Sequence, residues 1–127
     1  NNVEWIEWVD HSEMDQLYHN SDVFLFPSHE GAGMVVPEAM SHGVPVLTFD
    51  NVGPGELVGI EELTVKYQNY DQSTIDFASK LLGLYLDPSK RLRLQKSVKD
   101  KHAKHLTWSA KGEIIRKELN QILNNQL

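Results

Sequence analysis

Two short apolar runs separated by a glycine-bounded segment constrain the fold of this chain most. Residues 23–28 (VFLFPS) and 45–49 (PVLTF) are rich in β-branched and aromatic side chains, which favours strands. Between them the sequence predicts a helix from about Val35 to His42, which ends at Gly43. Because two parallel strands need a crossover connection, this order predicts a parallel βαβ unit.

The same alternation extends over residues 1–70. Residues 3–8 (VEWIEW) and 63–67 (LTVKY) predict two further strands. Between the predicted strands at 3–8 and 23–28, the segment HSEMDQLYHN predicts a helix with Ser12 as its N-cap. Apolar strands that alternate with helices predict an α/β fold, a Rossmann-like parallel sheet with helices on both faces.

From Asp71 onward the sequence predicts only helices. Their expected ranges are 73–86, Pro88 to about His105, and Thr107 to about Leu123, with Thr107 as an N-cap. The last of them carries an apolar stripe at helical spacing: Ala110, Ile114, Ile115, Leu119 and Ile122. We therefore expect residues 1–127 to form a single domain, with an α/β part at about 1–70 and terminal helices at about 71–127.

Length and composition fit one soluble domain. The chain has 127 residues, of which 40% are hydrophobic and 24% charged, enough to bury a core. It has no cysteine, which excludes disulfides and thiolate metal sites. No apolar run is long enough to span a bilayer, so a cytoplasmic location is expected.

The chain begins at Asn1, directly against a predicted strand, and we expect it to be a fragment of a longer protein. A full domain of the doubly wound type has about six strands, whereas the sequence predicts four. The resulting unpaired edge predicts a tendency of the fragment to self-associate.

The net charge of −6 is distributed unevenly. Residues 1–70 hold twelve acidic residues and one basic residue, a net charge of −11. Residues 71–127 hold six acidic and eleven basic residues, a net charge of +5. The acidic half argues against a nucleic-acid partner. The basic run at 90–105 is interpreted as a solvated face, with peripheral binding to an anionic membrane as the alternative.

The segment HEGAG follows directly after the predicted strand at 23–28. In open α/β sheets ligands bind beyond the carboxyl ends of the strands, which is where this segment lies. Gly31 and Gly33 permit close backbone approach, and free N–H groups near Met34 to Val36 would suit a phosphate. Taken alone, a glycine turn without a ligand explains the pattern equally well.

Two carboxylates, Glu30 and Glu38, flank this turn. In a helical segment they would lie roughly 12 Å apart, farther than the ~5 Å or ~6.5–9.5 Å that glycosidase carboxylates need. Carboxylates accept hydrogen bonds from sugar hydroxyls. Two carboxylates on either side of a phosphate-binding turn therefore suit a nucleotide sugar as ligand.

The string PSHEGAGMVVPEAMSHGVPVL, with its Glu, seven residues, Glu spacing, resembles the C-terminal domain of retaining glycosyltransferases with the two-domain GT-B fold, of the glycosyl transferases group 1 type. VEWIEWVD, LYHNSDVFLFPS, GPGELV and LTWSA resemble further segments of that family, so the resemblance covers about residues 3 to 120. It implies a nucleotide-sugar donor, an unidentified acceptor, sugar transfer with retained configuration, and no cofactor or metal held by this segment.

Position by position, the resemblance implies that Glu30 is catalytic and contacts the hydroxyls of the donor sugar. The amides of residues Gly31, Ala32, Gly33, Met34 and Val35 would hold the sugar and the distal phosphate, and Glu38 the ribose hydroxyls. Glu56 matches a glutamate of the family whose role the sequence does not assign.

The sequence departs from the family in two respects. Ala32 stands where the family usually has a large aromatic residue. The Arg and Lys that bind the diphosphate in the family lie upstream of Asn1, as does the N-terminal domain, so the chain alone is expected to be inactive. Lys66, on a predicted strand, is the one basic residue of the acidic half.

Several other interpretations remain open from the sequence. The same resemblance fits an epimerase or phosphorylase of this fold, or a non-catalytic module. His102 and His105 are interpreted as surface residues rather than metal ligands. His29 is expected to have a packing or surface role rather than to touch the ligand. The three tryptophans, Trp5, Trp8 and Trp108, are expected to anchor the core and interfaces.

Overall fold

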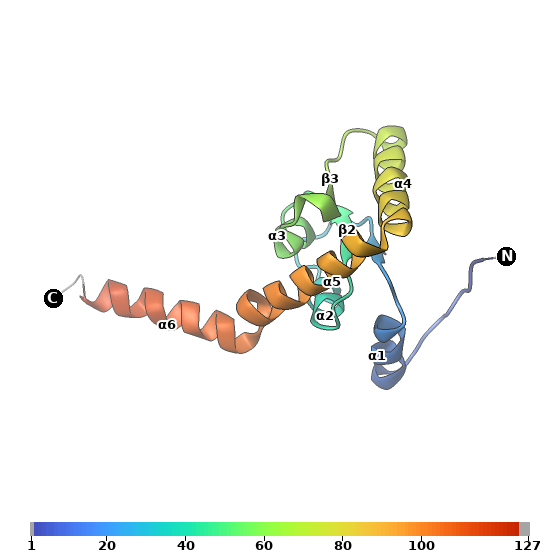
Figure 1. Ribbon diagram of the computed structural model, residues 1–127. Helices are drawn as coiled ribbons and strands as arrows, with labels where there is room; N and C mark the ends of the chain where they lie inside the picture. The colour runs from blue at the N-terminus through green and yellow to red at the C-terminus, as the bar shows by residue number, and fades with distance from the viewer. Residues whose placement is uncertain (1, 125–127) are drawn as a thin grey trace.

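Three parallel strands form the centre of the computed structural model, which describes residues 2–124. They are β1 (Phe24–Phe26), β2 (Val46–Phe49) and β3 (Thr64–Val65), in the order β1-β2-β3 (Figure 1). Phe24 is paired with Val46, and Thr48 with Thr64. The strands predicted at 23–28, 45–49 and 63–67 are thus confirmed, although β3 is only two residues long.

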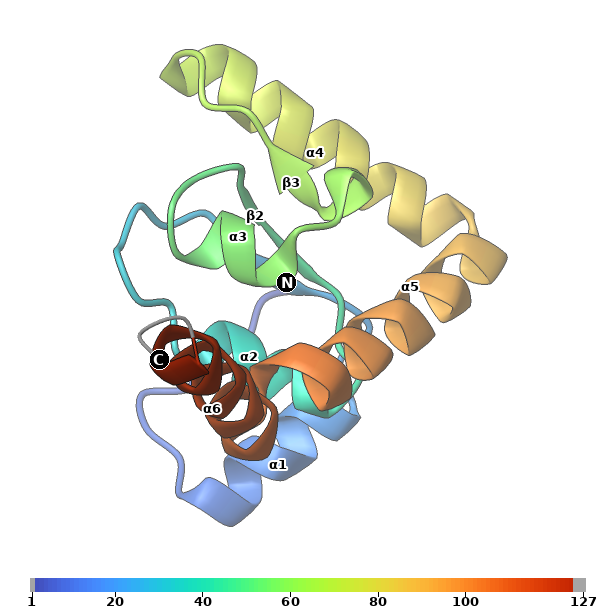
Figure 2. The same ribbon diagram turned by 90° about the vertical axis from the view of Figure 1, so that its left-hand side faces the viewer.

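Helices cover both faces of this sheet, as the sequence predicts. They are α2 (Val35–Ser41), α3 (Pro54–Val58), α4 (Tyr70–Leu86) and α5 (Pro88–Lys101). Figure 2 shows the sheet between α4 on one side and α2 on the other. Along β2, Val46 packs toward α2, α3 and α5, whereas Leu47 and Phe49 pack against Phe77 of α4. This alternation follows from the period of two along a strand.

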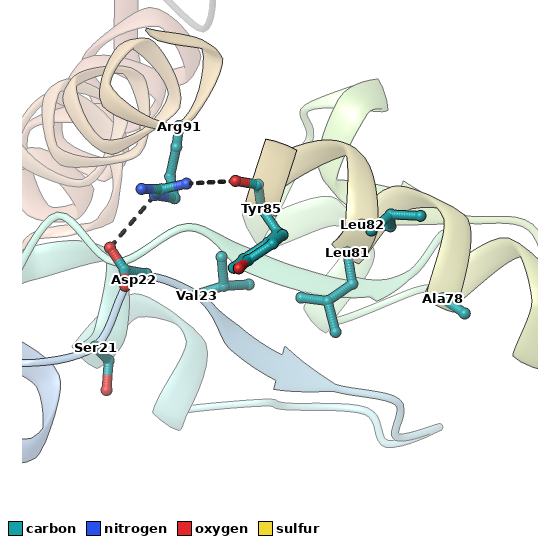
Figure 3. Close-up of a pocket in the computed structure, with 8 residues that line it drawn as sticks. All are labelled: Ser21, Asp22, Val23, Ala78, Leu81, Leu82, Tyr85 and Arg91. Atoms are coloured by element: carbon teal, nitrogen blue, oxygen red, sulfur yellow. Dashed lines mark hydrogen bonds and ion pairs between the residues drawn. The ribbon is translucent and has the colours of Figure 1, made fainter. Parts of the chain in front are cut away.

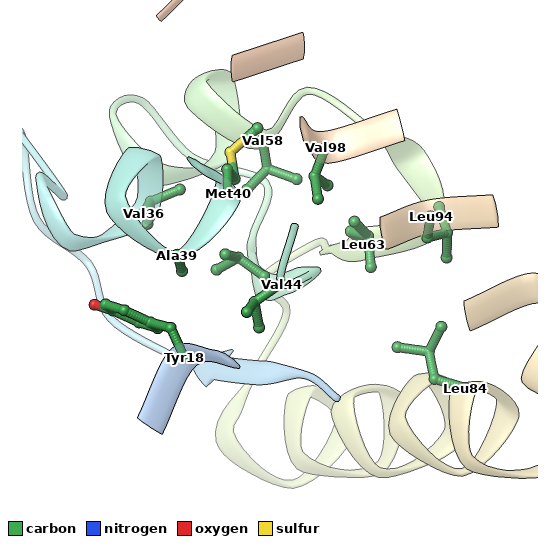
Figure 4. Close-up of a cluster of buried hydrophobic side chains, with 11 residues drawn as sticks. Tyr18, Val36, Ala39, Met40, Val44, Val58, Leu63, Leu84, Leu94 and Val98 are labelled. Carbon is green, nitrogen blue, oxygen red and sulfur yellow. The ribbon is translucent and has the colours of Figure 1, made fainter. Parts of the chain in front are cut away.

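The larger core cluster lies on the α2 side of the sheet (Figure 4). Met40 and Leu63 are fully buried there, and each such side chain stabilises the fold by roughly 1.5–3 kcal/mol. The buried members of the cluster are Tyr18, Val36, Ala39, Met40, Val44, Val46, Val58, Leu63, Leu84, Leu94 and Val98.

The first helix, α1 (His11–His19), starts two residues earlier than a Ser12 cap would place it. Its N-cap is Asp10, whose carboxylate accepts a hydrogen bond from the Glu13 N–H, while the Glu13 carboxylate accepts one from the Asp10 N–H. This reciprocal capping box satisfies two backbone donors, so it prevails over Ser12. The Ser12 hydroxyl instead donates to Asp10 Oδ1 at 2.8 Å.

The predicted C-terminal helices are confirmed. After α5 a π-helical turn, η2 (His102–Leu106), leads into α6 (Trp108–Asn124), whose N-cap Thr107 accepts a hydrogen bond from the Ala110 N–H at 3.1 Å. No residue of α6 is buried, and its apolar stripe faces solvent. Figure 1 shows α6 projecting away from the sheet.

The strand predicted at residues 3–8 is wrong. Residues 2–10 form no regular structure, and in the described chain β1 pairs only with β2. A strand is stabilised by pairing and by burying one face, and this segment does neither, because Trp5 and Trp8 are 88% and 80% exposed. Trp108 is 88% exposed as well, so none of the three tryptophans belongs to the core.

Two short helices were not predicted from the sequence. They are α3 and the 3-10 turn η1 (Glu61–Leu63), which together connect β2 to β3. No helix within residues 2–124 is long and apolar enough to cross a membrane.

Candidate functional site

Two glycine-containing loops meet at the carboxyl ends of β1 and β2. A Cβ atom added at Gly53 would lie 2.7 Å from the carbonyl oxygen of Gly31 and 2.8 Å from that of Glu30. One added at Gly33 would lie 2.7 Å from Cγ of Pro54. Both glycines have positive φ, 88° and 57°. A side chain at Gly53 would press on the backbone of the other loop and one at Gly33 on the Pro54 ring, so the two loops pack too closely for other residues at these positions.

Asn51 joins the same two loops through its side chain. Its Oδ1 accepts a hydrogen bond from the Gly55 N–H at 3.1 Å, and its Nδ2 donates to the carbonyl of Ser28 at 3.4 Å. Asn51 was not predicted from the sequence as part of the site. Its position two residues after a predicted strand was the available signal, because Asn readily bonds nearby backbone groups.

The loop after β1 carries Glu30 and a row of N–H groups without protein acceptors. Glu30 is exposed, and its Oε2 accepts a hydrogen bond from the Ser28 hydroxyl at 3.4 Å. Within residues 2–124, no backbone or side-chain acceptor pairs with the N–H groups of residues 31–35. Val36, expected among the free donors, instead donates to the Gly33 carbonyl at 2.8 Å. The donors that remain for a ligand therefore end at Val35.

Glu38 lies on α2, with Tyr18 of α1 beside it. Burial raises the pKa of the Tyr18 phenol, and the negative charge of the nearby Glu38 carboxylate raises it further. The Tyr18 ring stacks on His42 with 5.2 Å between ring centroids. His42 lies one turn after Glu38, and its Nε2 is 3.3 Å from Oδ1 of Asp15. Tyr18 is thus held beside Glu38, a neighbour that the sequence analysis missed.

A groove of 450 Å³ borders the two loops, and the C-terminal helices form its other wall. We call it the glycine-loop groove; it is lined by Gly31, Ala32, Val52, Gly53, Glu56, Leu57, Lys101, His105, Leu106 and Lys111. Burial lowers the pKa of Lys101, whose Nζ donates to the carbonyl of Val58 at 2.8 Å. The basic half of the chain therefore reaches the acidic half at this site, an arrangement that was not predicted from the sequence.

A second groove, of 740 Å³, lies at the start of β1 rather than at its carboxyl end (Figure 3). It is largely apolar, with Val23 and Leu81 in its wall. At one end Arg91 Nε lies 3.3 Å from Asp22 Oδ1, and Arg91 Nη1 donates to the Tyr85 carbonyl. Because ligands of such sheets bind beyond the carboxyl ends of strands, this groove is not part of the candidate site.

His29 packs against aromatic rings of the sheet side while remaining exposed, in line with the packing or surface role expected for it. Its ring stacks on Phe49 with 4.6 Å between centroids and meets Tyr67 edge-on. Within the described part of the chain, no three His, Asp or Glu side chains come together in a way that could hold a metal ion.

A three-stranded parallel sheet flanked by helices places this chain in the Rossmann-like class of α/β domains. The family Glycosyl transferases group 1 matches residues 1–101, and the chain belongs to this family. The resemblance to the C-terminal part of GT-B glycosyltransferases is thereby confirmed.

Two curated proteins illustrate the relationship. The chain is 40% identical over 67 residues to an alpha-1,3/1,6-mannosyltransferase of Eremothecium gossypii, a match that covers 52% of this chain and 12% of that protein. It is 38% identical over 48 residues to the GtfA subunit of a UDP-N-acetylglucosamine–peptide N-acetylglucosaminyltransferase of Streptococcus parasanguinis, covering 37% of this chain and 10% of that protein. The matches thus span about a tenth of either relative. No solved structure matches the chain.

Proposed function

We propose that this chain is the donor-binding part of a retaining glycosyltransferase, which moves a sugar from a nucleotide-diphosphate donor to an acceptor in polysaccharide or glycoconjugate biosynthesis. One observation carries the proposal: in a member of this family, Glu30 and Glu38 flank a loop whose N–H groups at 31–35 have no protein acceptor. Unpaired backbone donors beside two carboxylates suit a ligand that joins phosphates to hydroxyl-rich groups.

Each part of the loop has a distinct task in this proposal. Glu30 accepts hydrogen bonds from the donor sugar and fixes its orientation. The N–H groups of residues 31–35 bind the diphosphate and stabilise the charge that it gains as its bond to the anomeric carbon breaks. The oxygen of the acceptor hydroxyl then bonds to that carbon with configuration retained, and the proton of the hydroxyl passes to an oxygen of the departing diphosphate. Glu38 binds the ribose hydroxyls. We expect the sugar transfer to take place in the cytoplasm, with or without peripheral contact of the protein to a membrane.

Amide-resolved NMR titration tests the donor site directly. We expect one of UDP, GDP or ADP to shift the amides of residues 31–35 and of Glu38, with smaller changes elsewhere. Because one relative is named for UDP-N-acetylglucosamine and the other for mannose transfer, UDP-N-acetylglucosamine and a nucleotide-mannose are the first sugars to add. If no nucleotide shifts these amides at millimolar concentration, in this chain or in a longer protein that contains it, the proposal fails.

Replacing Tyr18 with Phe is expected to weaken donor binding by roughly three- to tenfold, because the ring stays but the hydroxyl near the Glu38 carboxylate is lost. The titration that gives the nucleotide Kd measures this. Tyr85→Phe is the matched control, since Tyr85 is 75% exposed on α4. Equal Kd values for Tyr18→Phe and wild type would show that Tyr18 does not orient Glu38. A thermal melt checks that folding is unchanged.

A further inference from the structure

Basic side chains outnumber carboxylates in the lining of the glycine-loop groove. Lys101, His105 and Lys111 line it, against a single carboxylate, Glu56. None of the ion pairs found in residues 2–124 involves any of these three basic residues. Lys101 is held by a carbonyl, and Lys111 is exposed at the start of α6. Two lysines around a groove that holds a single carboxylate favour an anionic ligand.

The opposite wall of the groove offers backbone donors to the same ligand. Gly31 and Ala32 line it, and their N–H groups are among those without a protein acceptor. The space beside Gly31 is open, because a Cβ atom added there would meet no atom within 4 Å. Backbone N–H groups facing basic side chains are a common arrangement for binding phosphate oxygens.

We propose that the glycine-loop groove binds a phosphate group, with Lys111 as its cationic contact, the His105 ring as a further contact and the loop at Gly31 and Ala32 as its backbone contact. This rests on the proposed function, which it extends to the C-terminal helices. The phosphate belongs either to the diphosphate of the donor or to a phosphorylated acceptor, and both offer the same oxygens to the groove.

The test compares three variants of this chain by amide-resolved NMR, with inorganic phosphate and inorganic diphosphate as probes. Lys111→Gln is expected to raise the Kd of both probes about three- to tenfold through loss of a charge-assisted hydrogen bond. Glu56→Gln is expected to lower the Kd, because it removes the opposing charge. Lys117→Gln, exposed on the same helix but outside the groove, is the matched control and leaves the Kd unchanged.

A further titration with phosphate at saturating nucleotide distinguishes the two sources. If the site belongs to the donor, the nucleotide displaces phosphate and Lys111→Gln also weakens nucleotide binding. If it belongs to an acceptor, phosphate still binds and Lys111→Gln leaves the nucleotide Kd unchanged. Either result supports a phosphate site in the groove.

The proposal is overturned if Lys111→Gln and Lys117→Gln bind the probes equally well, or if phosphate shifts no amide of the groove. Should nucleotides still shift residues 31–35 and Glu38 in that case, the donor site stands without the groove. Should phosphate bind in a Lys111-dependent way while no nucleotide binds, the groove stands and the donor site fails.

Discussion

Replacing Glu30 with Gln is expected to lower the turnover of the glycosyltransferase that contains this chain by about 100-fold or more, with nearly unchanged nucleotide affinity. Glutamine keeps the size of the side chain and its contact with Ser28 but loses the charge that orients the donor sugar. Steady-state kinetics with varied donor, together with a nucleotide Kd, measure both effects.

Glu38→Ala is the counterpart of this variant. We expect it to raise the donor Kd roughly 10- to 100-fold, since hydrogen bonds to a charged group contribute about 1.5–3 kcal/mol, and to reduce turnover at saturating donor much less. The reverse pattern, with binding lost in Glu30→Gln and turnover lost in Glu38→Ala, would mean that the two roles are exchanged.

The second large effect is expected at Gly53. A methyl group there would press on the carbonyl oxygens of Gly31 and Glu30, at a backbone φ of 88°. Overpacking costs about 1–3 kcal/mol and the left-handed backbone about 1–2, so Gly53→Ala should lower the free energy of unfolding by roughly 2–5 kcal/mol. Denaturant unfolding measures the change.

Gly83→Ala serves as the control for Gly53→Ala. Gly83 lies within α4, and a Cβ atom there meets nothing within 4 Å, so alanine should stabilise the chain by about 0.5–1 kcal/mol. If Gly53→Ala proved as stable as the wild type, the two loops would not be interlocked. If it unfolded only slightly earlier but shifted the amides of residues 31–35, the strain would be confined to the loops.

The βαβ core could be predicted from the sequence because its signals are local. Residues 23–28 and 45–49 carry the β-branched and aromatic side chains of buried strands, and Gly43 ends α2 with a φ of 78°. The glycine turn was likewise placed correctly at the carboxyl end of β1, since that position follows directly from the end of the strand.

What could not be predicted depends on contacts distant in the sequence. Residues 3–8 have the composition of a strand, but a strand forms only where a neighbouring strand pairs with it. The composition of a segment does not reveal whether such a neighbour is present. Lys101, His105 and Lys111 reach the loop at Gly31 only through the path of α5, η2 and α6. Likewise, α3 begins in a Gly-Pro-Gly sequence that is typical of a loop, and its buried Val58 holds it as a helix.

The solvent-facing stripe of α6 has a consequence for hydrogen exchange. With no buried residue, α6 is supported by its own backbone bonds, its Thr107 cap and the turn before it, and isolated helices of this length are marginal in water. Its amides should therefore exchange through local opening at a small fraction of the free energy that protects β2, whose four residues are all buried. Because Lys111 lies in the first turn of α6, any ligand that holds its ammonium group would slow that exchange and so report its own binding.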